Sequence, residues 1–156
     1  MSNSGIIPAA TPPQMEQVRR LFREYAEATG ACECFQGFAH EVAGLPGPYA
    51  PPTGQLLLAR ADTQPAGCVA LRRIDVGFCE MKRLYVRPEF RGRSLGRELD
   101  ESILCEARRI GYHAMRLDTL SSMTAARALY LSLGFQIIPR YNDNPSPDAL
   151  YFELAL

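Results

Sequence analysis

The chain has 156 residues, of which 47% are hydrophobic and 22% charged, a balance typical of one compact α/β domain. Its 17 basic and 17 acidic residues cancel, which disfavours a general nucleic-acid-binding surface. No run approaches the roughly 18 apolar residues that span a bilayer, and residues 1–5 lack the layout of a signal peptide. We therefore expect one domain over residues 1–156, in the cytoplasm, with no membrane or nucleic-acid partner.

The five cysteines lack the paired spacing of a disulfide framework or a zinc site. Cys32 and Cys34 could contribute two metal ligands, but no second cysteine pair or histidine pair completes a four-ligand site. We therefore predict free thiols and no metal.

The first half of the chain predicts a short strand, two helices and three strands. Thr11 and Gln14 form a capping box for a helix over residues 12–29, which Gly30 ends. A shorter helix over 33–44 and a Pro/Gly-rich loop to 53 follow. Strands are expected at 5–8, 55–61, 66–74 and 78–86, with a hairpin connection at 62–65.

The second half alternates helices and strands. Apolar residues at helical spacing predict a helix over 95–110, ended by Gly111. A strand at 114–119, a helix capped by Ser122 or Thr124 and running to 133, and strands at 135–139 and 149–154 complete the order β-α-α-β-β-β-α-β-α-β-β.

A basic, glycine-containing turn joins the strand at 78–86 to the helix at 95–110. Its sequence is Arg-Gly-Arg-Ser-Leu-Gly, residues 91–96. Helix N-termini offer unpaired N–H groups and the positive end of the macrodipole, so they suit phosphate. Arg87, Arg91, Arg93 and Arg97 add positive charge there. No Gly-Lys-Ser/Thr or GxGxxG pattern is present, which disfavours the nucleotide sites of those types.

With its flanks, this segment closely resembles motif A of the GNAT superfamily of N-acetyltransferases. Residues 84–96 match a strand that ends in Val-x-Pro, followed by Gln/Arg-x-x-Gly-x-Gly/Ala. Residues 126–135 match the family's motif B, Ala-x-x-Leu-Tyr-x-x-x-Gly-Phe. The resemblance implies an α/β (α+β) fold in which a central, mixed, twisted sheet of about six to seven strands is flanked by about four helices.

The resemblance also implies acetyl-CoA as co-substrate. The residues that would bind it are Leu84, Tyr85, Val86, Arg91, Gly92, Arg93, Ser94, Leu95, Gly96 and Arg97. Two positions depart from the family pattern. Ser94 replaces the central glycine of motif A, and Met123 stands where many members have an asparagine that contacts the pantetheine arm.

Two side chains match catalytic positions of the family. Glu80 would be a general base acting through water, and Tyr130 would protonate the departing CoA sulfur; an ion pair and a half-buried core tyrosine are the plainer alternatives. Strand alternation without a bulge would put four side chains on one face, Glu80, Lys82, Leu84 and Val86. Cys79 would point the other way, which disfavours a cysteine-based route.

The resemblance implies that the acceptor would bind between residues 31–53 and 139–148. Aromatic side chains (Phe35, Phe38, Tyr49 and Tyr141) could line this cleft, and acidic ones (Glu33, Glu41 and Asp143) could attract an amine. Arg72 and Arg73 could instead recognise a carboxylate. Asp118 with Ser121 and Ser122 is interpreted as a strand end and helix cap.

The sequence thus predicts an N-acetyltransferase that moves an acetyl group to a primary amine by direct attack in a ternary complex. Its acceptor would be a small-molecule amine or a peptide, and the family resemblance allows a homodimer. The alternatives are a protein or peptide N-acetyltransferase and a catalytically silent acyl-CoA-binding module.

Overall fold

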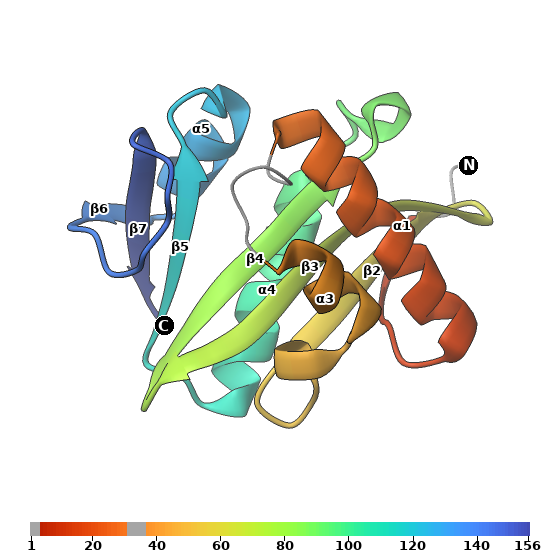
Figure 1. The fold of residues 1–156 in the computed structure, drawn as a ribbon, viewed down its shortest axis with the longest axis horizontal. Helices are drawn as coiled ribbons and strands as arrows, with labels where there is room; N and C mark the ends of the chain where they lie inside the picture. The colour runs from red at the N-terminus through yellow and green to blue at the C-terminus, as the bar shows by residue number, and fades with distance from the viewer. Residues whose placement is uncertain (1–3, 31–36) are drawn as a thin grey trace.

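The computed structural model describes residues 4–30 and 37–156, which form a mixed, seven-stranded sheet with helices on both faces (Figure 1). The strand order is β1-β2-β3-β4-β5-β7-β6. The strands are β1 (Ser4–Pro8), β2 (Gln55–Ala61), β3 (Gln64–Asp75), β4 (Phe78–Val86), β5 (Ala114–Leu120), β6 (Gln136–Ile138) and β7 (Ala149–Ala155). β4 and β5 pair in parallel, and the other neighbours pair antiparallel. The predicted fold class is confirmed.

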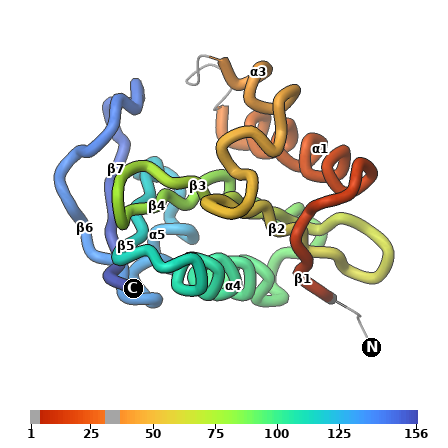
Figure 2. The backbone as a smooth tube through the Cα atoms, turned by 90° about the horizontal axis from the view of Figure 1, so that it is seen from below, coloured from red at the N-terminus to blue at the C-terminus, as the bar shows by residue number. Residues whose placement is uncertain are grey.

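The helices cover the sheet in two layers (Figure 2). α1 (Pro12–Thr29) and α3 (Phe38–Ala43) lie on one face, and α4 (Leu95–Ile110) lies on the other. α5 (Thr124–Ser132) follows β5, and two 3-10 turns occupy Gly47–Tyr49 and Pro88–Phe90. One buried cluster includes Val18, Leu21 and Phe22 of α1, and the other includes Leu99 and Ile103 of α4. The sheet therefore separates two cores.

Local signals explain most helix boundaries. The Thr11 side chain accepts from the Gln14 amide at 3.3 Å, and the Gln14 side chain accepts from the Thr11 amide at 3.0 Å. Gly30, at φ 69°, ends α1 in the left-handed conformation that glycine adopts without a Cβ clash. The predicted cap of α5 is wrong, because Met123 occupies the cap position and no side chain caps the helix. The predicted helix over 33–44 is described only from Phe38, and its earlier part lies outside the described residues.

The β2–β3 connection is tighter than the sequence predicts. Ala61 pairs with Gln64, so Asp62 and Thr63 alone make the turn, and β3 begins two residues early. Pro65 lies inside the strand, beside a shift of register between Ala59 and Arg60. A bulge is one of the few places where a strand accepts proline.

One irregularity of the sheet matters most for function. β4 and β5 pair only from Phe78 to Glu80 and from Ala114 to Arg116. Beyond these residues the two strands diverge (Figure 1), so the middle of the sheet opens toward the carboxyl ends of both strands.

Among the described residues, no helix is long and apolar enough to cross a membrane.

Candidate active site

A cavity occupies the opening between β4 and β5. The empty space between its lining atoms is about 380 Å³, a volume that includes open solvent. Its lining combines both strands with α1 and α5: Tyr25, Met81, Lys82, Arg83, Leu84, Leu117, Asp118, Thr119, Met123 and Tyr130. Among the predicted site residues, Leu84 and Tyr130 thus lie together, although they are far apart in the sequence.

A β-bulge in β4 corrects the predicted orientation of its side chains. Lys82 pairs with Ala70 and Tyr85 pairs with Cys68, so β4 has one extra residue between these pairs. Arg83 there has φ 60°, in the left-handed region. Leu84 and Val86 consequently pack against the α4 core, whereas Tyr85 joins the α1 core. The prediction that Leu84 and Val86 share a face with Glu80 is therefore wrong, because the bulge reverses the alternation.

The predicted phosphate-binding residues lie in one turn at the start of α4. Gly92 has φ 79° and Ser94 has φ 62°, and no side chain caps the helix. The first backbone bond into the helix runs from the Glu98 amide to the Ser94 carbonyl at 3.0 Å. The amides of Leu95, Gly96 and Arg97 therefore lack helical partners and can receive an anion.

The arginines around this turn differ in their availability. Arg87 is held by Glu24 through two bonds of 2.9 and 2.7 Å, so it serves the contact between β4 and α1. Arg91 donates to the Val86 carbonyl at 3.0 Å, and Arg93 lies over the Phe90 ring. Arg97 donates to the Ser132 hydroxyl at 2.6 Å, which ties α4 to α5. Arg91, Arg93 and Arg97 remain the cations that border the turn.

Ser94 occupies a backbone conformation that suits glycine. A left-handed conformation costs an L-residue roughly 1–2 kcal/mol, which a glycine at this position would not incur. Part of the stability gained by that replacement is offset, because glycine has the larger conformational entropy in the unfolded state. We expect Ser94→Gly to raise the free energy of unfolding by about 0.5–1 kcal/mol, measured by urea denaturation. Gly92→Ala is the matched control at φ 79°, where an added Cβ meets no atom within 4 Å, and it should lower stability. Equal or lower stability of Ser94→Gly would contradict this strain.

Tyr130 is 5% exposed and packs edge-on against Phe135, with Phe152 also beside it. Tyr130 is one of the residues that line the cavity, and no hydrogen-bond partner for its hydroxyl is found within residues 4–30 and 37–156. Burial, followed by the nearby carboxylate of Asp100, raises the pKa of the Tyr130 phenol well above its usual value. A phenol in this state keeps its proton at neutral pH, so the hydroxyl is available as a donor.

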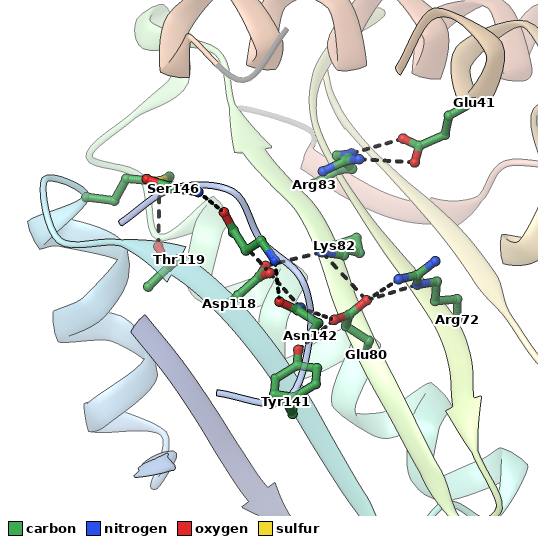
Figure 3. A network of polar contacts seen from close by, with 12 residues as sticks. Glu41, Arg72, Glu80, Lys82, Arg83, Asp118, Thr119, Tyr141, Asn142 and Ser146 are labelled. Atoms are coloured by element: carbon green, nitrogen blue, oxygen red, sulfur yellow. Dashed lines mark hydrogen bonds and ion pairs between the residues drawn. The ribbon is translucent and has the colours of Figure 1, made fainter. Parts of the chain in front are cut away.

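Glu80 is completely buried beside the cavity and belongs to a polar network (Figure 3). Arg72 contacts its Oε1 through Nε at 2.9 Å and Nη2 at 2.8 Å, and Lys82 Nζ lies 3.6 Å from the same oxygen. Tyr141 donates its hydroxyl to Oε2 at 2.6 Å, and Asn142 donates to the same atom at 3.4 Å. Both oxygens of Glu80 are therefore engaged, and Arg72 neutralises its charge.

Asp118 is the site residue that the sequence interpretation missed. Lys82 donates to its Oδ1 at 3.2 Å, and the side-chain amides of Asn142 and Asn144 donate to its Oδ2 at 2.8 and 3.2 Å. Burial raises the pKa of Asp118, but Lys82 and the two amides outweigh it and lower that pKa overall. Asp118 is thus an ionised carboxylate in the cavity wall, and the loop between β6 and β7 is bound to the sheet through it and Glu80.

The other predicted acceptor residues are only partly brought together. Glu41 binds Arg83 and accepts from the Tyr49 hydroxyl at 3.2 Å, while Phe38 lies near the Arg83 guanidinium. Arg73 is bound to the Asp75 carbonyl, apart from Arg72. Glu33, Phe35, Cys32 and Cys34 lie outside the described residues. Within the described ranges, no group of three or more His, Cys, Asp or Glu could hold a metal ion.

Comparisons with known proteins identify the family of this chain. The acetyltransferase (GNAT) family matches residues 15–135. An uncharacterized N-acetyltransferase of Schizosaccharomyces pombe is 39% identical over 99% of this chain and 96% of that protein. A crystallised acetyltransferase from Streptococcus agalactiae has a TM-score of 0.83 at 23% identity, covering 98% of both chains. An N-acetyltransferase from Thermoplasma acidophilum, solved with coenzyme A, has a TM-score of 0.78 at 17% identity, covering 99% of both chains. The chain therefore belongs to the GNAT family of acetyltransferases and is an acyl-CoA-dependent enzyme.

Proposed function

We propose that the chain transfers an acetyl group from acetyl-CoA to a primary amine by direct attack in a ternary complex. The observation that supports this most is Tyr130, which lines the cavity where β4 and β5 separate and whose hydroxyl has no hydrogen-bond partner in the described part of the chain. The amine nitrogen attacks the thioester carbonyl carbon, the carbon–sulfur bond breaks, and the departing thiolate takes the Tyr130 proton. The Tyr130 phenolate then takes a proton from solvent, which restores the enzyme.

The opening turn of α4 is proposed to hold the CoA pyrophosphate. Its uncapped amides point to that role, and the space beside Gly92, empty to 4 Å from a would-be Cβ, leaves room for a phosphate to approach the backbone. Arg91, Arg93 and Arg97 add charge. Backbone groups of Leu84, Tyr85 and Val86 are proposed to bind the pantetheine arm, because β4 has no β5 partner at these positions.

Glu80 is proposed as the general base, acting through Tyr141. Neither Glu80 nor Tyr141 is among the residues that line the cavity, so the amine proton is proposed to reach this pair through a water molecule. The Tyr141 hydroxyl can take the proton from that water as it passes its own proton to Oε2 of Glu80, 2.6 Å away. Burial and the negative charge of Glu80 raise the pKa of Tyr141 strongly, so the hydroxyl relays a proton without becoming a lasting phenolate.

We expect Glu80→Gln and Tyr141→Phe each to lower kcat by about 10- to 100-fold, because each interrupts the same proton path. The double variant should lose little more than either single one. Steady-state release of free thiol with a reactive amine is the measurement. Arg73→Gln, an exposed cation on the same strand as Arg72, is the control and should keep full activity. Additive losses would show that the two residues act separately.

The proposed function itself is tested by thiol release from acetyl-CoA across a panel of amines. Acetylated amine, identified by its mass, must appear in step with the thiol. Tight CoA binding without transfer to any amine or peptide would support the silent module instead, and loss of CoA binding would contradict the role of the α4 turn.

A further inference from the structure

Arg83 is the residue that the bulge of β4 presents to the cavity. Its backbone has φ 60° in the middle of a strand, whereas the other non-glycine residues with positive φ in the described ranges lie in turns. Such strain persists where the surrounding structure enforces it, often at a binding site. Arg83 and Tyr130 are both among the residues that line the cavity, yet only 5% of the Arg83 side chain is exposed. The bulge thus places a buried guanidinium on a residue of the same cavity lining as the proposed acid.

The partners of this guanidinium form a receptor for a carboxylate. Nε and Nη2 of Arg83 contact the two oxygens of Glu41, each at 3.0 Å (Figure 3). The rings of Tyr25 and Phe38 lie 5.9 and 5.4 Å from the same guanidinium carbon. This two-bond geometry is the one in which arginine recognises carboxylates. Glu41 is the more exposed partner at 22% and lies on the six-residue helix α3, so it is the member that a ligand can displace.

The charge of the cavity lining points the same way. Lys82 and Arg83 contribute two positive charges, and Asp118 contributes one negative charge. A reactive acceptor must present a neutral amine, so an acceptor that also has a carboxylate enters as an anion. Lys82 is paired with Asp118 at 3.2 Å, so the Arg83 charge, once Glu41 is displaced, is the one that stabilises that anion and lowers the pKa of its amine, which favours the nucleophilic form.

We infer that the acceptor is an amino acid, and that Arg83 binds its carboxylate in place of Glu41. This inference rests on the proposed function and names the acceptor class of the same site. Arg83 fixes the carboxylate end, and the amine then lies toward the thioester and Tyr130. Glu41 keeps the Tyr49 hydroxyl, 3.2 Å away, as a partner when it leaves Arg83. A pair that only fastens α3 to the sheet would instead have no preference for the charge of the acceptor.

The test uses the twenty L-amino acids and their matched carboxamides, which differ in the charge that Arg83 would recognise. Equilibrium binding to the CoA-saturated protein is measured by calorimetry, and kcat/KM is measured by thiol release from acetyl-CoA. At least one amino acid should be preferred over its carboxamide by about 10- to 100-fold, the range for hydrogen bonds to a charged group. In Arg83→Gln the preference should disappear, and Glu41→Gln should bind the amino acid more tightly because its competitor is removed. Arg83→Lys, which keeps the charge but not the two-bond geometry, should keep part of the preference.

The outcomes separate this inference from the proposed function. Acetyl transfer without a preference for the acid in any pair would overturn the inference and leave the proposed function standing. Selective binding of an amino acid that depends on Arg83, without thiol release, would support the inference and contradict the proposed function. A preference that persists in Arg83→Gln, or equal losses for acid and carboxamide in both the Arg83 and Glu41 variants, would assign the pair to anchoring α3 and overturn the inference.

Discussion

We expect Tyr130→Phe to lower kcat by about 100- to 1,000-fold while leaving the stability of the protein nearly unchanged. Removing a positioned acid forfeits a large part of the roughly 10²- to 10⁴-fold gain of acid catalysis. The phenylalanine ring keeps the packing against Phe135 and Phe152. Because the hydroxyl has no partner in the described part of the chain, its loss breaks no internal hydrogen bond. Thiol release at saturating acetyl-CoA measures kcat, and thermal unfolding measures stability.

A second tyrosine provides the matched control. The Tyr151 hydroxyl on β7 is buried and has no hydrogen-bond partner among the described residues, but Tyr151 does not line the cavity. Tyr151→Phe should therefore match Tyr130→Phe in stability and retain the activity of the wild type. A faster leaving group offers a further check, since an acyl donor whose thiolate needs no proton should restore much of the lost rate in Tyr130→Phe. Equal activity of the two variants would remove Tyr130 from the chemistry.

The elements of the fold were predictable where a local signal defines them. The capping box of Thr11 and Gln14 and the glycines at 30 and 111 mark helix ends through groups only a few residues apart. The cap of α5 could not be predicted this way. Met123 takes the cap position between the two predicted caps, Ser122 and Thr124, and neither hydroxyl caps the helix. Nearby, Ser121 is bound to Asp148 at 2.8 Å, a long-range contact that the local sequence does not indicate.

The site was predictable where a motif defines it and unpredictable where a backbone irregularity does. Motif resemblance located the α4 turn, and the φ of 62° at Ser94 explains why glycine is usual there. The predicted faces of the β4 side chains are wrong after Lys82, because one extra residue at Arg83 reverses the face of every later side chain. Nothing in the sequence near Asp118 indicates that Lys82, Asn142 and Asn144 meet there, since these contacts depend on how the β6–β7 loop folds back.

Asp100 gives the largest expected effect on stability. It lies in α4 at 1% exposure, and neither of its carboxylate oxygens has a hydrogen-bond partner in the described part of the chain. Burial, opposed by Arg97 and reinforced by Glu101, raises the pKa of Asp100 from 3.8 to about 7. The folded state therefore holds this proton more tightly than the unfolded state does. Asp100 leaves the free energy of unfolding unaffected below about pH 4. Its contribution lowers that free energy as the pH rises toward 7 and levels off above it, with a maximal loss of roughly 4 kcal/mol.

We accordingly expect Asp100→Asn to match the wild type near pH 4.5 and to become the more stable protein at pH 8, by at most roughly 4 kcal/mol. Urea denaturation at several pH values measures the difference. Glu101→Gln, an exposed carboxylate on the next residue, is the control and should give a small difference that varies little with pH. A constant difference between Asp100→Asn and the wild type would mean that Asp100 is not protonated in the folded state.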